Sequence, residues 1–205
     1  MKAIRIYVEG GGKAETKGEI RRGFRGFLKG IYALAREKET RKSVAVIACG
    51  SRDSTFEAFS IAIKSDPHSF NVLLVDSDAT VKDTPRKHLQ TQNSNWKLQR
   101  VADNQCHLMV QMMEAWIVAD MKALEEYYGQ GFKRTSIPRT TDVERIDRVQ
   151  LMRALKSATR KTQKGEYSKT RHAPDLLERL DASKVRTAAR HCELLFAVLE
   201  KKVKS

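Results

Sequence analysis

Residues 4–12 read IRIYVEGGG, a run of β-branched and aromatic side chains that ends abruptly at Glu9 and three glycines. An apolar run that opens into a glycine turn is typical of a buried strand followed by a loop. The pattern recurs in residues 43–49 (SVAVIAC), 71–75 (NVLLV) and 107–112 (HLMVQM). Because helical patterns separate these runs, we predict an α/β fold with a mostly parallel four-stranded sheet flanked by helices.

The segments between and after the strands predict helices. Apolar side chains recur at helical spacing over residues 15–38, and Asp53 is placed to cap a helix over residues 53–64. Beyond residue 140 no strand pattern remains, and helices are predicted over residues 143–160, 174–180 and 182–203. We expect an α/β core over residues 1–140 and a basic helical C-terminal extension over residues 141–205, packed on the core as one continuous domain.

The composition is that of a globular protein. Of the 205 residues, 40% are hydrophobic and 31% are charged, and no apolar run approaches the about 18 residues that a membrane span needs. The opening MKAIRIYVEG lacks the apolar region of a secretory signal, so we expect a cytoplasmic location. Cys49, Cys106 and Cys192 contain no CxxC pair, which argues against a disulfide framework or a structural zinc site.

The chain is strongly basic. Lys and Arg number 39 against 25 acidic residues, and the net charge of +14 favours polyanionic partners, nucleic acid first. The alternative is that the protein is basic without binding nucleic acid. The densest basic stretch, residues 153–171, has several of its charges at helical steps, and Arg52 follows the second strand. The predicted nucleic-acid contacts are therefore Arg52, Arg153, Lys156, Arg160, Lys164 and Arg171, although a basic helix face can also be merely solvated.

Acidic residues follow two of the predicted strands. Glu9 ends the first strand, and Asp76 and Asp78 follow residues 71–75. Ligands of open parallel sheets bind outside the carboxyl ends of the strands, and residues two apart in an extended segment point to the same side. A cluster of carboxylates suits Mg²⁺ or Mn²⁺. The alternative is that Asp76 and Asp78 only cap or solvate a turn.

The combination of VEGGG, a strand ending at CGS, and LLVDSDA resembles the Toprim domain of topoisomerases, primases and the OLD-family nucleases of phage defence. The sequence is most similar to a Toprim-like family often associated with defence ATPases. Members of that family also have a helix that begins with Glu and Trp and a Tyr-x-Lys segment, which appear here in residues 113–116 (MEAW) and 167–169 (YSK).

The resemblance implies that Glu9, Asp76 and Asp78 are metal-binding and catalytic acids and that Glu114 is a further metal ligand. It also implies that Lys169 stabilises charge on phosphate. Nuclease members have Thr-Glu soon after VEG, whereas this chain reaches Glu15 later; Glu15 is either a second ligand or an acid at a helix N-terminus.

These features predict a Mg²⁺-dependent nuclease that hydrolyses DNA or RNA, in a phage-defence or repair system with an ATPase partner. Two cations would activate water and neutralise the leaving oxygen, while Glu9 binds metal or helps to deprotonate the nucleophile. The alternative is a noncatalytic Toprim-like module that binds nucleic acid or a protein. A third hypothesis is a phosphohydrolase or nucleotidyl transferase that acts on small nucleotides.

Overall fold

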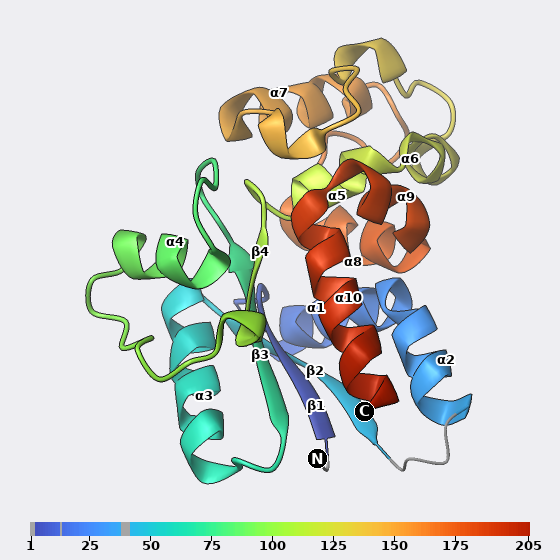
Figure 1. Ribbon diagram of the computed structural model, residues 1–205. Helices are drawn as coiled ribbons and strands as arrows, with labels where there is room; N and C mark the ends of the chain where they lie inside the picture. Colours follow the sequence, from blue (N-terminus) through green and yellow to red (C-terminus); the bar gives the residue numbers. More distant parts are fainter. Residues whose placement is uncertain (1–2, 13, 38–41) are drawn as a thin grey trace.

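The computed structural model describes residues 3–12, 14–37 and 42–205, and its centre is a parallel sheet (Figure 1). The strands are parallel, in the order β2-β1-β3-β4. Their bounds are β1 (Ala3–Glu9), β2 (Ser43–Gly50), β3 (Phe70–Asp76) and β4 (Cys106–Met109). The predicted α/β fold with a four-stranded parallel sheet, flanking helices and a helical C-terminal region is confirmed.

Helices cover both faces of the sheet. The connection from β1 to β2 contains α1 (Ala14–Phe27) and α2 (Lys29–Glu37), and the connection from β2 to β3 contains α3 (Arg52–Ser65). The second connection crosses over β1, so right-handed crossovers place α3 on the face opposite α1 (Figure 1). The side chains of β1 alternate accordingly: Ile6 lies in the apolar cluster with α1, and Tyr7 lies in the cluster with Phe59 of α3.

The second half of the chain is mainly helical and packs on the first. The helix α8 lies against α1, and α10 contacts α2, β1 and β4. One apolar cluster runs from Ile4 to Val203, so the two predicted parts share a core. The helices after β3 are α4 (Pro85–Gln92), α5 (Glu114–Ala119), α6 (Met121–Tyr128), α7 (Arg148–Thr159), α8 (Lys169–Arg179), α9 (Ala182–Ala188) and α10 (Arg190–Lys204). None of the helices in the described part of the chain is long and apolar enough to cross a membrane.

Several helix boundaries differ from the predictions because contacts across the fold set them. The helix predicted over residues 15–38 is interrupted at Leu28, where Ile31 N–H donates to Leu28 O between two glycines. The helix predicted over residues 182–203 is two helices, because the distant Glu144 carboxylate accepts the backbone N–H of His191 and caps α10.

Two local predictions need smaller corrections, and one helix was not predicted. The N-cap of α3 is Ser51, which accepts from Ser54 N–H, and Asp53 lies inside the first turn. The helix predicted to start at Pro174 begins at Lys169, so Pro174 lies within α8. The helix α4, capped by Thr84, was not predicted because its residues PRKHLQTQ carry little apolar periodicity.

Close approach of α1 to α8 depends on two glycines. A Cβ atom at Gly23 would lie 2.6 Å from the carbonyl oxygen of Pro174, and one at Gly26 would lie 2.7 Å from Cγ of Glu178. Both distances are shorter than a real contact, so α8 can reach this position only because α1 has no side chain there. Since α8 begins at Lys169, this contact also determines where the Lys169 side chain lies.

We expect Gly23→Ala to lower the free energy of unfolding by about 1–3 kcal/mol, the usual cost of overpacking. Gly18→Ala is the matched control, because Gly18 lies in the same helix and an added Cβ would meet nothing within 4 Å. That control should raise stability by up to about 1 kcal/mol through helix propensity. Urea denaturation followed by circular dichroism measures both, and equal effects would show that the contact does not require glycine.

Candidate functional site

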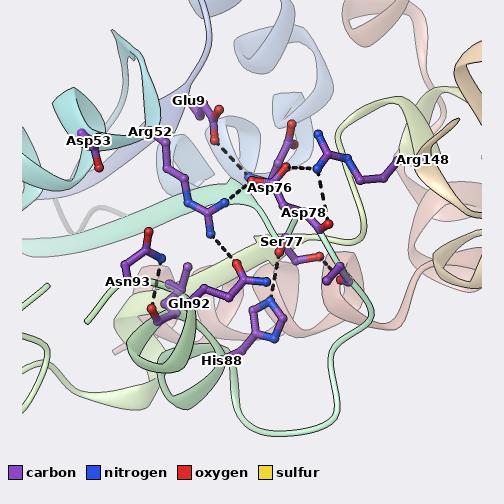
Figure 2. Close-up of polar contacts among 12 residues, drawn as sticks. Glu9, Arg52, Asp53, Asp76, Ser77, Asp78, His88, Gln92, Asn93 and Arg148 are labelled. Carbon is purple, nitrogen blue, oxygen red and sulfur yellow. Dashed lines mark hydrogen bonds and ion pairs between the residues drawn. The ribbon is translucent and has the colours of Figure 1, made fainter. Parts of the chain in front are cut away.

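The candidate site lies between β1 and β3, where the chain order of the sheet reverses. Connections leave these two neighbouring strands toward opposite faces, which opens a crevice at their carboxyl ends. Glu9 ends β1 and Asp76 ends β3. The backbone N–H of Asp76 donates to Glu9 Oε2 at 3.3 Å, so the two strand ends are in direct contact (Figure 2).

Asp76 is buried, and both of its carboxylate oxygens are bonded. Oδ1 accepts the backbone N–H of Met113 at 2.8 Å, immediately before α5. Oδ2 lies 3.2 Å from Nζ of Lys169, the first residue of α8. The carboxylate therefore joins the end of β3 to the starts of two helices that are remote in the sequence.

Glu114 adds a third carboxylate to this group. The side chain is fully buried, and Oε1 accepts the hydroxyl of Tyr167 at 2.9 Å. Oε2 lies 3.5 Å from Lys169 Nζ but has no hydrogen-bond partner. A buried acceptor without a partner costs free energy, so this oxygen is an uncompensated polar atom next to Lys169.

Glu9, Asp76 and Lys169 also line a common cavity of about 170 Å³. Its wall includes Gly10 and Gly11, which both have positive φ. The glycine turn that follows β1 therefore borders the carboxylates, as expected for a loop that admits a ligand close to the backbone.

The acidic side chains of this group outnumber its basic side chain, and their pKa values are shifted. Burial and the neighbouring charge of Asp76 raise the pKa of Glu9 to about 7, although the N–H of Asp76 and the charge of Lys169 oppose the shift. Burial likewise raises the pKa of Glu114. Partial burial disfavours the charged form of Lys169, but the carboxylates of Asp76 and Glu114 outweigh it and raise the lysine pKa. Three carboxyl groups thus share one ammonium, and we call Glu9, Asp76, Glu114 and Lys169 the carboxylate cluster.

The carboxylate of Asp78 does not join the carboxylate cluster. Its carboxylate pairs with Arg52 and Arg148, with Arg148 Nη1 at 2.7 Å from Oδ1 (Figure 2). The expectation that Asp76 and Asp78 point to one side assumed an extended backbone. Asp76 is the last residue of β3, and Asp78 has φ of +58°, so the alternation of a strand no longer applies.

The carboxylate oxygens of the cluster are donors of the kind that binds divalent cations, but their present arrangement is not that of a metal site. Among residues 3–12, 14–37 and 42–205, no group of three or more His, Cys, Asp and Glu side chains is arranged to hold a metal ion. Carboxylate oxygens are nevertheless the ligands that Mg²⁺ and Mn²⁺ prefer, and Oε2 of Glu114 is unpaired. Glu9, Asp76 and Glu114 would hold such an ion, and in the present structure the Lys169 ammonium pairs with two of these carboxylates instead.

The predicted nucleic-acid contacts divide into two groups. Arg52 forms an ion pair with Asp78, two residues after Asp76 of the cluster. Arg153 and Lys156 line an open depression on α7 together with Arg148. The others lie elsewhere: Arg160 is the exposed C-cap of α7, Lys164 lies over the ring of Tyr127 at 4.6 Å, and Arg171 is exposed on α8. Glu15 is exposed in the first turn of α1.

Two contributing residues, Arg148 and Tyr167, were not assigned roles by sequence reasoning. Arg148 is one of many basic residues, and nothing local distinguishes it; only the fold brings it to Asp78. Tyr167 belongs to the segment that suggested Lys169, yet its bond to Glu114 spans 53 positions.

These features define an α/β protein with an open parallel sheet and a charged pocket at its topological switch point. The chain belongs to the family described as a domain of unknown function, DUF4276, whose model matches residues 8–200. No curated protein and no solved structure matches the chain. The matched range includes the whole carboxylate cluster, and the family description assigns it no activity.

We predict that Glu9 makes the stability of the metal-free protein depend on pH. Its pKa in the folded state is about 7, above the ordinary 4.5, so the stabilisation is complete below about pH 4.5 and is lost as pH rises through 7. Relative to Glu9→Gln, the wild type should lose about 1–2 kcal/mol between pH 5 and pH 8, after allowance for partial solvent screening.

Urea denaturation in EDTA at several pH values measures this difference. Glu126→Gln is the control, because Glu126 is exposed and pairs with Lys122 one helical turn away. Its profile should run parallel to that of the wild type. A Glu9→Gln profile that also runs parallel would contradict the raised pKa.

Proposed function

We propose that the protein is a divalent-metal-dependent nuclease that hydrolyses phosphodiester bonds of DNA or RNA. The observation that carries the proposal is the unequal charge of the cluster, in which Glu9, Asp76 and Glu114 share one ammonium at the carboxyl ends of the strands. Burying an excess of carboxylates is costly unless protonation or a ligand compensates for it. A divalent cation with a phosphate is the ligand that best fits such a group.

Three residues of the cluster have roles that their surroundings support. Mg²⁺ or Mn²⁺, when bound, would activate water and neutralise charge on the phosphate. Glu9, whose Oε2 already faces the end of β3, would bind the metal or help to deprotonate the nucleophile. Asp76 is fixed by the N–H of Met113, and Lys169 presents an ammonium that can bind a phosphate oxygen.

The charge of the whole chain supports a polyanionic substrate. The net charge of +14 favours nucleic acid through release of counterions. The helix α7, which carries Arg153 and Lys156, lies beyond the carboxyl ends of the strands (Figure 1). The resemblance to Toprim-like domains associated with defence ATPases extends the proposal to an ATPase partner in a phage-defence or repair system.

The second candidate is a noncatalytic module that binds nucleic acid or a protein. It is favoured by one observation: without a cation, Lys169 pairs with Asp76 and Glu114, while Arg52 and Arg148 pair with Asp78. A site neutralised by its own side chains can be stable without metal. The nuclease therefore requires that metal binding and cleavage both depend on Asp76, whereas the noncatalytic module shows no metal-dependent cleavage.

We expect the purified protein to cleave plasmid, single-stranded DNA or RNA with Mg²⁺ or Mn²⁺ but not with EDTA. Asp76→Asn keeps the acceptor for Met113 N–H and removes the charge, and it should slow cleavage by about 100-fold or more. Asp103→Asn, at a surface ion pair with Arg86, should cleave like the wild type. Unchanged cleavage by Asp76→Asn would indicate a contaminant, and binding without metal-dependent cleavage would indicate the noncatalytic module.

We also expect Mn²⁺ or Mg²⁺ to raise the melting temperature of the wild type. A chain of this length gains about 2–4 °C for each kcal/mol of binding free energy. Asp76→Asn should show little or no shift, whereas Asp103→Asn should shift like the wild type. Differential scanning fluorimetry measures this without any substrate, and equal shifts in all three proteins would exclude the cluster as the metal site.

A further inference from the structure

Arg52 and Arg148 converge on Asp78 from helices that are remote in the sequence. Arg52 is the first residue of α3 and Arg148 is the first residue of α7. Arg52 pairs with Asp78 Oδ2, and Arg148 Nη1 lies 2.7 Å from Oδ1 and 3.3 Å from the backbone oxygen of Asp78 (Figure 2). We call this pair of guanidinium groups the arginine clamp.

Arg52 has two contacts in addition to its pair with Asp78. It donates to Gln92 Oε1 at 3.0 Å, and its guanidinium lies 5.7 Å from the ring centre of Trp96. Trp96 in turn stacks on Phe56 with ring centres 4.1 Å apart. Only 16% of the Arg52 side chain is exposed, so its guanidinium would remain in position if the Asp78 carboxylate moved away.

The side chain of Asp78 is more exposed than that of Arg52. Its side chain is 36% exposed, and it is the one non-glycine residue with positive φ in the part of the chain that the structure describes. That backbone conformation costs a residue other than glycine about 1 kcal/mol or more. The carboxylate is therefore an anion bound by two arginines, at a place that solvent can reach.

The clamp is continuous with a surface that suits a nucleic-acid strand. Arg148 lines an open depression of about 370 Å³ on α7. Val149, 57% exposed, gives this depression an apolar surface, and Arg153 and Lys156 are among its cationic residues. A positively charged groove that follows the phosphate backbone is one of the features by which proteins bind single-stranded nucleic acid.

We propose that the arginine clamp is a phosphate subsite and that Asp78 occupies it until a phosphate of the substrate strand displaces the carboxylate. Asp78 then acts as a positioning residue that keeps the two guanidinium groups together, and not as a metal ligand. The inference rests on the proposed function in taking nucleic acid as the ligand. Guanidinium groups bind phosphate and carboxylate with similar geometry, so the exchange keeps both arginines paired.

The position of the subsite also narrows the substrate class. Only Ser77 separates Asp76 in the carboxylate cluster from Asp78 in the clamp. A single strand that occupied both sites would place one phosphate at the cluster and another at the clamp. The arrangement therefore favours a polynucleotide over a mononucleotide.

The test measures binding of a fluorescein-labelled single-stranded DNA oligonucleotide by fluorescence anisotropy in EDTA, where no metal-dependent cleavage occurs. Asp78→Asn removes the internal competitor, and Asn tolerates positive φ well. We expect this variant to bind about tenfold more tightly than the wild type. Arg148→Met should bind about tenfold more weakly and lower the salt dependence by about one counterion.

Asp103→Asn is the matched control. It makes the same change in net charge and likewise releases an arginine, Arg86, from an ion pair. Its affinity should stay within about threefold of the wild type. Circular dichroism and melting temperature establish that each variant is folded. The proposal is overturned if Asp78→Asn binds no more tightly than Asp103→Asn, or if folded Arg148→Met binds like the wild type.

The outcome is independent of the nuclease assay. Tighter binding by Asp78→Asn together with no cleavage in Mg²⁺ or Mn²⁺ would support the subsite and refute the nuclease. A different result would overturn the subsite: cleavage depends on Asp76, and Asp78→Asn loses both metal binding and cleavage. That result would support the nuclease and assign Asp78 as a metal ligand.

Discussion

The ammonium of Lys169 lies between the carboxylates of Asp76 and Glu114, and this contact joins the end of β3 to the starts of α5 and α8. The position of α8 depends in turn on its close approach to α1 at Gly23. The packing of two helices thereby determines where the only ammonium of the carboxylate cluster is held. Such a cluster adds little to stability compared with apolar packing, and this is the premise of the proposed metal site.

The fold could be predicted because its main determinants are local. The continuous apolar runs of β1, β2 and β3 and the glycine after Glu9 are visible in any short window of the sequence. Helix ends were harder, because distant groups determine them. The break before α10 depends on Glu144, which lies 47 positions from His191, and no local pattern contains that information.

The site could be predicted in part for the same reason. Strand ends identified Glu9 and Asp76, since carboxyl ends of adjacent parallel strands must meet, and the Toprim resemblance added Glu114 and Lys169. The direction of Asp78 could not be predicted, because it follows from one left-handed backbone conformation. Arg148 was not singled out, because basic residues are frequent in this chain and only the tertiary fold selects one.

Two groups of charged side chains lie next to each other at the end of β3, one with an excess of acidic residues and the other with an excess of basic residues. The carboxylate cluster holds three acids and one base, and the arginine clamp holds two bases and one acid. A cation alone would meet the nearby arginines, and a phosphate alone would meet the three carboxylates, so each ligand by itself is opposed by one of the groups. Bound together, cation and phosphate relieve both imbalances, and on the proposed function their affinities should therefore reinforce each other.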